Sequence, residues 1–310
     1  MKNKRLLGSL LLTLTAIIWG TAFVFQRSGM DRIEPITFNA ARLTLSTAAV
    51  GLVALLQRKK PAFSDAAEEK TYKKSTVIGG VLCGVFLSAA STLQQMGLVY
   101  TTAGKAGFIT SLYILIVPVV SLIVFKKRGT PFVWIGVPLG VLGMYLLCIT
   151  ESFRLARGDL LILACAVFFS CHILTCDRFA PRGNPIRISA IQFAVATTVS
   201  WIAAFITETP SVEKITSAAV PIVFCGIVSG GVGYTLQITA QRFTDPTVAS
   251  LLMSLESVFA VISGALILHE RMSARELIGC AVMFCAIVIV QLPVPGKKKR
   301  QRQDNGRTAR

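Results

Sequence analysis

Charged side chains inside long apolar stretches are the residues of this sequence that could do chemistry. Glu256 lies about twelve residues into one such stretch, Arg42 about eight residues into another, and Lys105 near the end of a third. A charge in a bilayer is costly and usually faces the interior of the helix bundle or a water-filled cavity. A buried carboxylate can bind a proton or a cationic substrate in alternation, whereas the two cations would attract an anionic group.

Each of these residues also has an explanation without function. Glu256 could form a structural hydrogen bond between helices, Arg42 a structural ion pair or carbonyl contact, and Lys105 could extend to the membrane interface. His172 fits a hydrogen-bonded packing residue better than a ligand. The remaining candidates are uncharged polar or aromatic side chains in the same stretches, which could line a substrate path: Gln94, Gln237, Tyr113, Trp19 and Tyr234.

The composition decides what positions these side chains. The chain has 310 residues, of which 53% are hydrophobic and 15% charged, whereas soluble domains carry about 25% charged residues. The apolar runs approach the roughly 20 residues of a spanning helix and exceed the length of a barrel strand. We therefore expect an all-α integral membrane protein with ten spans at about 6–29, 35–56, 76–99, 102–125, 132–150, 158–177, 186–207, 216–241, 245–268 and 275–294.

The excess of positive charge is distributed unevenly over the loops. The net charge is +17, and most Lys and Arg lie in the N-terminus, the loops after the even-numbered spans, and the basic tail at 297–310. Cytoplasmic loops of membrane proteins carry this excess. The pattern predicts a multi-pass protein of the cell membrane whose N- and C-termini are cytoplasmic. The expected partner of the basic residues is the lipid bilayer rather than nucleic acid.

The chain repeats itself. Ser91–Arg128 aligns with Tyr234–Arg271, and Pro35 aligns with Pro185, so that residues 1–150 and 151–296 form two copies of one unit. Five spans in each copy force the second copy to enter the membrane from the opposite side. Inverted repeats with a binding site at their interface are typical of secondary transporters. The sequence thus predicts two inverted five-helix repeats around a central cavity.

Other chemistries find little support in the sequence. Eight cysteines lie in apolar spans without a C-x-x-C pair, and we interpret them as small hydrophobic residues rather than metal ligands or disulfides. No P-loop, G-x-S-x-G or H-E-x-x-H pattern is present. We expect no enzymatic activity and no cofactor. The alternatives are a membrane-embedded enzyme acting on lipid-borne substrates and a non-transporting receptor or assembly protein.

Several short motifs, at the right places in the repeat, resemble the drug/metabolite transporter superfamily in its ten-helix EamA form. They include Ile18-Trp19-Gly20, Pro35 with Arg42, the stretch 101–106 (TTAGKA), and Ser254-Leu255-Glu256. Two positions depart from the family pattern: Ser257 stands where proline is frequent, and Lys126-Lys127 stand where the first repeat often ends in glutamate.

The resemblance implies a basket of helices around a central cavity and the movement of small metabolites, often amino acids or related compounds and commonly outward. We therefore predict a secondary transporter that works by alternating access. Arg42 and Lys105 are expected to attract an anionic group of the substrate, and Glu256 to bind an amine or a coupling proton. The sequence leaves the substrate and the oligomeric state open.

Overall fold

The computed structural model describes residues 2–57, 63–101, 103–126, 130–148, 157–267 and 273–292. Within these ranges the regular structure is entirely helical. The helices are α1 (Lys2–Gly29), α2 (Pro35–Leu56), α3 (Ala66–Leu98), α4 (Ala103–Thr110), α5 (Tyr113–Phe125), α6 (Pro131–Cys148), α7 (Arg157–Phe179), η1 (Ala180–Arg182), α8 (Pro185–Thr207), α9 (Val212–Ser217), α10 (Ala219–Val223), η2 (Phe224–Tyr234), α11 (Thr235–Gln241), α12 (Pro246–Met253), α13 (Glu256–Ile267) and α14 (Ala274–Gln291).

The surface and the interior have the polarity expected of a protein in lipid. In the described part of the chain, eight helical segments are long and apolar enough to cross a membrane, and shorter apolar helices lie at Pro131–Gly143 and Leu277–Val290. Large apolar side chains such as Leu55, Phe205 and Leu266 are exposed, whereas Asn39 and Gln192 are fully buried. Soluble monomers rarely expose so much apolar surface. The chain is a multi-pass membrane protein.

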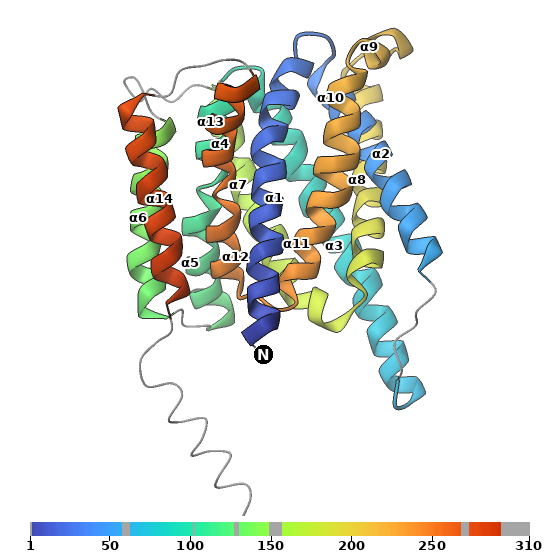
Figure 1. The fold of residues 1–310 in the computed structure, drawn as a ribbon. Coiled ribbons are helices and arrows are strands. Elements are labelled where there is room, and N and C mark those ends of the chain that lie inside the picture. The colour runs from blue at the N-terminus through green and yellow to red at the C-terminus, as the bar shows by residue number, and fades with distance from the viewer. Residues whose placement is uncertain are drawn as a thin grey trace, which may run out of the picture.

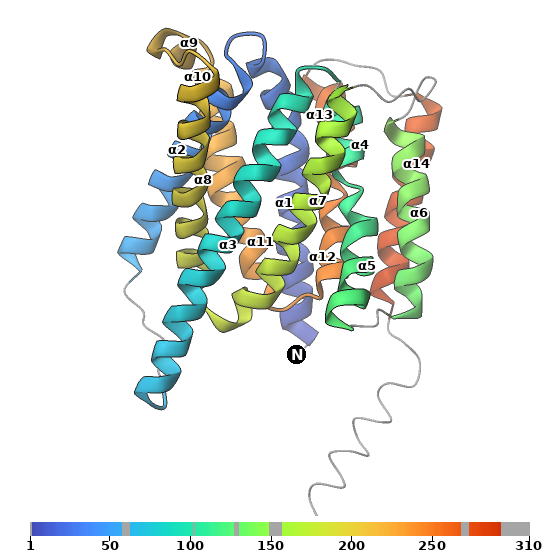
Figure 2. The same ribbon diagram turned by 180° about the vertical axis from the view of Figure 1, so that it is seen from behind.

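The helices form one bundle. The pair α6 and α14 lies at one end, and α2 packs against α8 at the other (Figure 1). In the middle, α1 contacts α13 and η2 on one side of the bundle, while α3 contacts α7 on the opposite side (Figure 2). Residues from both halves of the sequence therefore meet in the centre.

Two of the predicted spans are interrupted. The sequence predicts continuous helices at 102–125 and 245–268, but the structure breaks the first at Ser111-Leu112 and the second at Ser254-Leu255. The amide of Leu112 bonds to the carbonyl of Ile109, a three-residue turn in place of the α-helical bond. These breaks fall at aligned positions of the two repeats.

Local chemistry weakens the helical hydrogen bonding near both interruptions. Pro118 has no N–H for the carbonyl of residue 114, which weakens the first turn of α5. Near the second break, the hydroxyls of Ser250 and Ser254 donate to backbone carbonyls three residues earlier, at 2.9 and 2.8 Å. Such side-chain bonds compete with the helical ladder and bend helices. The two broken helices run in opposite directions, with α4 and α13 near one end of the bundle and α5 and α12 near the other (Figures 1 and 2).

The span predicted at 216–241 is a composite of α10, the π-helical stretch η2 and α11. The wider winding of a π-helix is frequent at functional sites. Its glycines permit close contact with α2, since a Cβ on Gly226 would lie 2.7 Å from both the Arg42 carbonyl oxygen and the Leu45 Cβ. Small residues at such positions let helix backbones approach closely in a membrane.

Two loops contain more helix than predicted. The segment 57–75 was expected to be a loop, but α3 begins at Ala66, because the Asp65 carboxylate accepts a hydrogen bond from the Glu68 amide at 2.7 Å. The loop around 208–215 includes α9, whose N-terminus is capped in the same way by Ser211. Capping side chains set the start of these helices, and a hydropathy profile does not detect such caps.

Candidate functional site

A pocket lies in the centre of the bundle, where helices from both halves of the chain converge. The space between its side chains, together with the solvent at its open side, is about 440 Å³. Seven of the nine residues predicted from the sequence line it: Trp19, Arg42, Gln94, Tyr113, Tyr234, Gln237 and Glu256. The fold thus brings together side chains from α1, α2, α3, α5, η2, α11 and α13.

Glu256 stands at the break between α12 and α13 and is 3% exposed. Its Oε1 atom accepts a hydrogen bond from the Ser111 hydroxyl at 3.1 Å and another from the Tyr113 hydroxyl at 3.0 Å. The Ser111 hydroxyl also lies 3.0 Å from that of Ser257. Because the helix is broken there, the carboxyl group occupies the first turn of α13, where the helix dipole favours negative charge.

Arg42 is fixed at one end and open at the other. Its Nε atom donates to Asn39 Oδ1 at 3.0 Å, and the Asn39 amide nitrogen in turn lies 3.1 to 3.3 Å from the hydroxyls of Ser91, Thr92 and Ser200. The terminal guanidinium nitrogens make no hydrogen bond to any described residue. A guanidinium held in this way can bind a carboxylate through two parallel hydrogen bonds.

The pocket keeps its two charges apart. Among the described residues, Arg42 has no ion pair with Glu256 or with any other carboxylate. Both are nearly buried, with Arg42 6% exposed. A buried charge without a partner is costly, so each of these groups gains when a ligand of opposite charge enters.

Aromatic and amide side chains complete the walls. The rings of Trp19 and Tyr234 lie 4.6 Å apart, and the Trp19 indole N–H donates to the Ser229 carbonyl at 3.3 Å. The Gln94 amide donates to Thr110 Oγ1 at 3.1 Å. The Oε1 atom of Gln237 is buried without a hydrogen-bond partner in the described structure, so it is an acceptor available to a ligand.

Two predicted residues have a different placement. His172 is fully buried and does not line the pocket; its Nε2 atom lies 2.9 Å from Gln192 Oε1, and its ring contacts the edge of Tyr234 at 5.7 Å. Lys105 lies in α4, but its side chain falls outside the part of the structure that is described. The structure therefore leaves the predicted role of Lys105 as a prediction.

Six further lining residues were absent from the sequence-based set: Phe23, Gln26, Thr110, Phe169, Ile173 and Ser229. Two of them could have been found. Phe23 and Gln26 follow Trp19 by four and seven residues, so they share its helical face. Gln26 is a buried polar side chain whose Oε1 atom has no partner among the described residues.

Comparison with known families identifies the chain. The sequence profile of the EamA-like transporter family matches twice, over residues 6–149 and 156–292. The chain belongs to this family. It is a membrane transporter of the drug/metabolite type, as the motifs in the sequence had indicated, and membership of a transporter family is compatible with the expectation that the protein is not an enzyme.

Individual relatives agree with this assignment. An "Uncharacterized transporter" of Archaeoglobus fulgidus is 30% identical over 296 residues, covering 94% of this chain and 88% of the relative. The "Uncharacterized transporter YoaV" of Bacillus subtilis is 23% identical and covers 92% of this chain and 95% of its own length. A crystal structure that is 20% identical superposes with a TM-score of 0.72 over 91% of this chain and 96% of its own, which shows a shared fold.

Proposed function

We propose that this EamA-family protein is a secondary transporter that exports a small zwitterionic metabolite, such as an amino acid or a related compound, across the cytoplasmic membrane. One observation carries the proposal: a central pocket contains the buried guanidinium of Arg42 and the buried carboxyl of Glu256 without an ion pair between them. A ligand with both a carboxylate and an ammonium group would satisfy both. The outward direction rests on the family resemblance.

The lining of the pocket supports a small ligand. Trp19, Phe23 and Phe169 supply apolar walls, and Gln94 and Gln237 supply polar groups between the two charges. This combination favours a metabolite with charged ends and a short, partly apolar body.

Contacts between aligned residues support two inverted repeats. Tyr113 and Glu256 are 143 positions apart and align with each other, and their side chains are hydrogen-bonded. Thr47 and Thr197 are 150 positions apart and also align, and their hydroxyls lie 2.8 Å apart. A residue meets its own counterpart only near a twofold axis, so both pairs would lie on the axis that relates the halves.

The lining of the pocket follows the same symmetry. Four aligned pairs contribute to it, one member from each half: Trp19 with Phe169, Phe23 with Ile173, Gln94 with Gln237, and Tyr113 with Glu256. A site at the interface of inverted repeats, next to broken helices, is the arrangement expected for alternating access. We infer ten spans, in which α4–α5, α10–η2–α11 and α12–α13 each cross once, with cytoplasmic termini as the basic loops indicate.

We further propose that Glu256 couples transport to protons. The hydroxyls of Ser111 and Tyr113 hold the carboxyl group at the edge of the pocket. Because these groups can donate to the ionised form, they stabilise the carboxylate that would bind the substrate amine. Release of the amine leaves a buried carboxylate, which a proton can then neutralise.

The decisive experiment is counterflow in proteoliposomes. The purified full chain is reconstituted into liposomes that are preloaded with a pool of amino acids and related metabolites. We expect it to exchange one or a few of these metabolites, and to do so faster with a pH gradient than without. Arg42→Gln is expected to reduce the exchange of carboxylate-bearing substrates at least tenfold, since a charge-assisted hydrogen bond contributes about 1.5–3 kcal/mol. Arg187→Gln, on the exposed face of α8, is the matched control.

Three outcomes would contradict the proposal. Exchange of uncharged solutes only would exclude a zwitterionic substrate. Equal exchange in the Arg42 and Arg187 variants would remove Arg42 from the site. The absence of any exchange, in liposomes where another transporter prepared in the same way is active, would favour a receptor or assembly role.

A further inference from the structure

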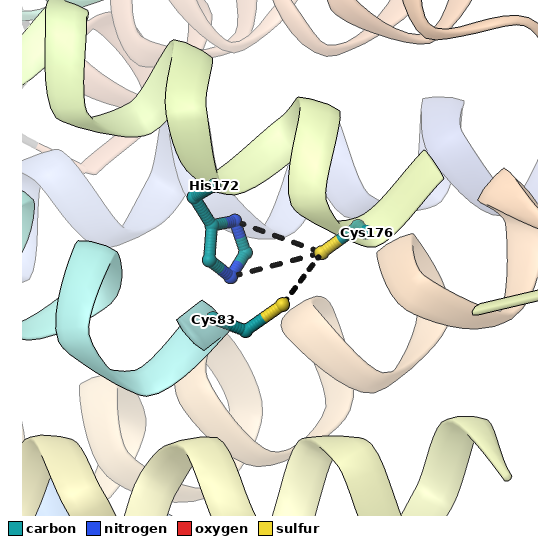
Figure 3. A group of neighbouring side chains, drawn as sticks. All are labelled: Cys83, His172 and Cys176. Atoms are coloured by element: carbon teal, nitrogen blue, oxygen red, sulfur yellow. Dashed lines mark hydrogen bonds between the residues drawn. The ribbon is translucent and has the colours of Figure 1, made fainter. Parts of the chain in front are cut away.

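A second cluster of reactive side chains lies beside the pocket without lining it. Cys83 of α3 meets His172 and Cys176 of α7, and all three are fully buried (Figure 3). The two sulfur atoms are 3.6 Å apart, and Cys176 Sγ lies 3.9 Å from His172 Nδ1 and 3.8 Å from His172 Nε2. The three ligand-type atoms lie within 4.8 Å of one another.

We propose that Cys83, His172 and Cys176 form a binding site for a thiophilic metal ion, with zinc as the ion that fits. Zinc bonds to sulfur at about 2.3 Å and to nitrogen at about 2.0 Å. A tetrahedral centre with these bond lengths places two sulfurs about 3.7 Å apart and sulfur and nitrogen about 3.5 Å apart. The distance between the two sulfurs, and those from Cys176 Sγ to the ring nitrogens, are within a few tenths of an ångström of these values. All three ligand atoms lie within 4.8 Å of one another, so Cys83 and the imidazole must move toward each other to close on an ion.

The histidine is oriented by a neighbouring group, as in known metal sites. Its Nε2 atom lies 2.9 Å from Gln192 Oε1, an atom that can only accept, so Nε2 carries the hydrogen. The lone pair is then on Nδ1, and Cys176 Sγ lies at nearly the same distance from the two ring nitrogens, 3.9 Å from Nδ1 and 3.8 Å from Nε2. Metal-binding histidines nearly always donate their other ring N–H to a carbonyl or carboxylate, and Gln192 supplies this second-shell contact.

Charge balance in a dry interior selects the ion. Both cysteines must lose their protons to bind a metal, and two thiolates cancel the charge of one divalent cation. The resulting zinc complex is neutral, whereas a monovalent copper ion with the same ligands would leave a buried negative charge, which is costly. Apolar side chains pack against the two cysteines, including Ala180, Ile188 and Ile238.

The cluster also lies where a metal would connect the two halves of the transporter. Next to it, α3 and α7 approach so closely that a Cβ on Gly79 would lie 2.6 Å from Phe179 Cβ. By the repeat alignment, the counterparts of Cys83, His172 and Cys176 are Gly226, Ala22 and Gln26. The site therefore exists at one end of the molecule only, and an ion in it would hold α3 of the first half against α7 of the second.

This assignment departs from the sequence-based interpretation of the cysteines as packing residues. Cys83 and Cys176 are 93 positions apart, and no local spacing joins them. The interpretation still fits Cys165 and Cys225, which are buried outside the cluster, whereas Cys285 is exposed on the outer surface. Cys83 and Cys176 are free thiols, so both are available as ligands.

Cobalt binding tests the proposal on the intact protein. The purified full chain is treated with a chelator in a reducing buffer, freed of the chelator, and titrated with Co²⁺. We expect one Co²⁺ per chain, a thiolate-to-cobalt charge-transfer band, and displacement of Co²⁺ by one equivalent of Zn²⁺. Cys83→Ser and Cys176→Ser should each weaken binding by about 100-fold, and Gln192→Leu by about tenfold, because second-shell changes typically cost 10–100-fold.

Cys165→Ser is the matched control, because Cys165 is also a buried cysteine of α7 and should leave the cobalt band unchanged. If a serine variant fails to fold, the melting temperature of the wild type is measured with and without Zn²⁺ instead. Zinc should raise this temperature, and by the same amount in Cys165→Ser. An absent charge-transfer band, a band that survives in both serine variants, or binding of Cu⁺ alone would overturn the zinc assignment. A disulfide between Cys83 and Cys176 in the isolated protein would also overturn the assignment.

Discussion

The exchange of Glu256 for glutamine is the sharpest test of the proposed substrate site. Glutamine has the shape of glutamate and keeps an acceptor oxygen for the hydroxyls of Ser111 and Tyr113, which lie 3.1 and 3.0 Å from Oε1. The variant therefore removes the negative charge and leaves the local hydrogen bonds in place. We expect the folded protein to be nearly unaffected, with a melting temperature within a few degrees of the wild type.

The expected loss of affinity follows from the burial of the carboxyl group. Glu256 is 3% exposed, and loss of one partner of a buried, hydrogen-bonded charge pair costs about 2–5 kcal/mol. A value of about 3 kcal/mol corresponds to roughly 100-fold weaker binding, at 1.4 kcal/mol per factor of ten. Substrate binding to the purified protein, measured by calorimetry, gives this ratio directly.

A pair of ligands separates a lost charge contact from general damage. The wild type should bind the transported amine about 100-fold more tightly than the analogue that lacks the amino group. Glu256→Gln should bind the two within about threefold of each other, and Glu213→Gln, an exposed change in α9, should behave as the wild type does. A variant that weakens both ligands equally, or that keeps the full preference for the amine, would refute an amine contact at Glu256.

Three further predictions concern neighbouring features. Tyr113→Phe removes one hydrogen bond to Glu256 and should weaken amine binding about tenfold in direct binding assays; an unchanged affinity would show that this bond does not support the carboxylate. Gly226→Val places atoms where α2 lies 2.7 Å away and should lower the melting temperature by several degrees, whereas an unaltered melting curve would contradict the packing described. The pKa of Glu34 is lowered chiefly by its hydrogen bond with Lys214, so this pair stabilises the protein above about pH 4.5 and the contribution disappears as the pH falls through the lowered pKa. A partly exposed pair contributes less than about 1 kcal/mol to the free energy of unfolding, so the melting temperatures of wild type and Glu34→Gln should differ only slightly at pH 7 and converge near pH 3. A difference that grows on acidification would have the wrong sign.

Membrane proteins reveal much of their architecture in composition. The low fraction of charged residues and the length of the apolar runs required helices in a bilayer, because unpaired backbone groups are too costly in lipid. The alignment of the two halves also placed Tyr113 opposite Glu256 before any contact was known, and the two side chains are hydrogen-bonded. Seven of nine candidate residues line one pocket, because polar side chains in apolar spans avoid lipid and face the centre of the bundle.

Other features depended on contacts that hydropathy does not encode. The breaks at Ser111 and Ser254 come from a proline and from serine hydroxyls that compete for backbone carbonyls, and a window average over about 19 residues smooths over both. The Asn39 side chain that holds Arg42 gave no signal, because its partners come from α3 and α8, far away in the sequence.

The sequence by itself determined that this protein crosses the membrane as helices, that its halves are copies, and that ionisable side chains such as Arg42 and Glu256 lie within the apolar spans. Each of these conclusions depends on local composition and on internal alignment, which the chain carries without folding. Only the tertiary structure decided which of those side chains share a pocket and which do not. Cys83, His172 and Cys176 form a cluster because α3 and α7 pack in one particular register, and side-chain packing between distant helices sets that register.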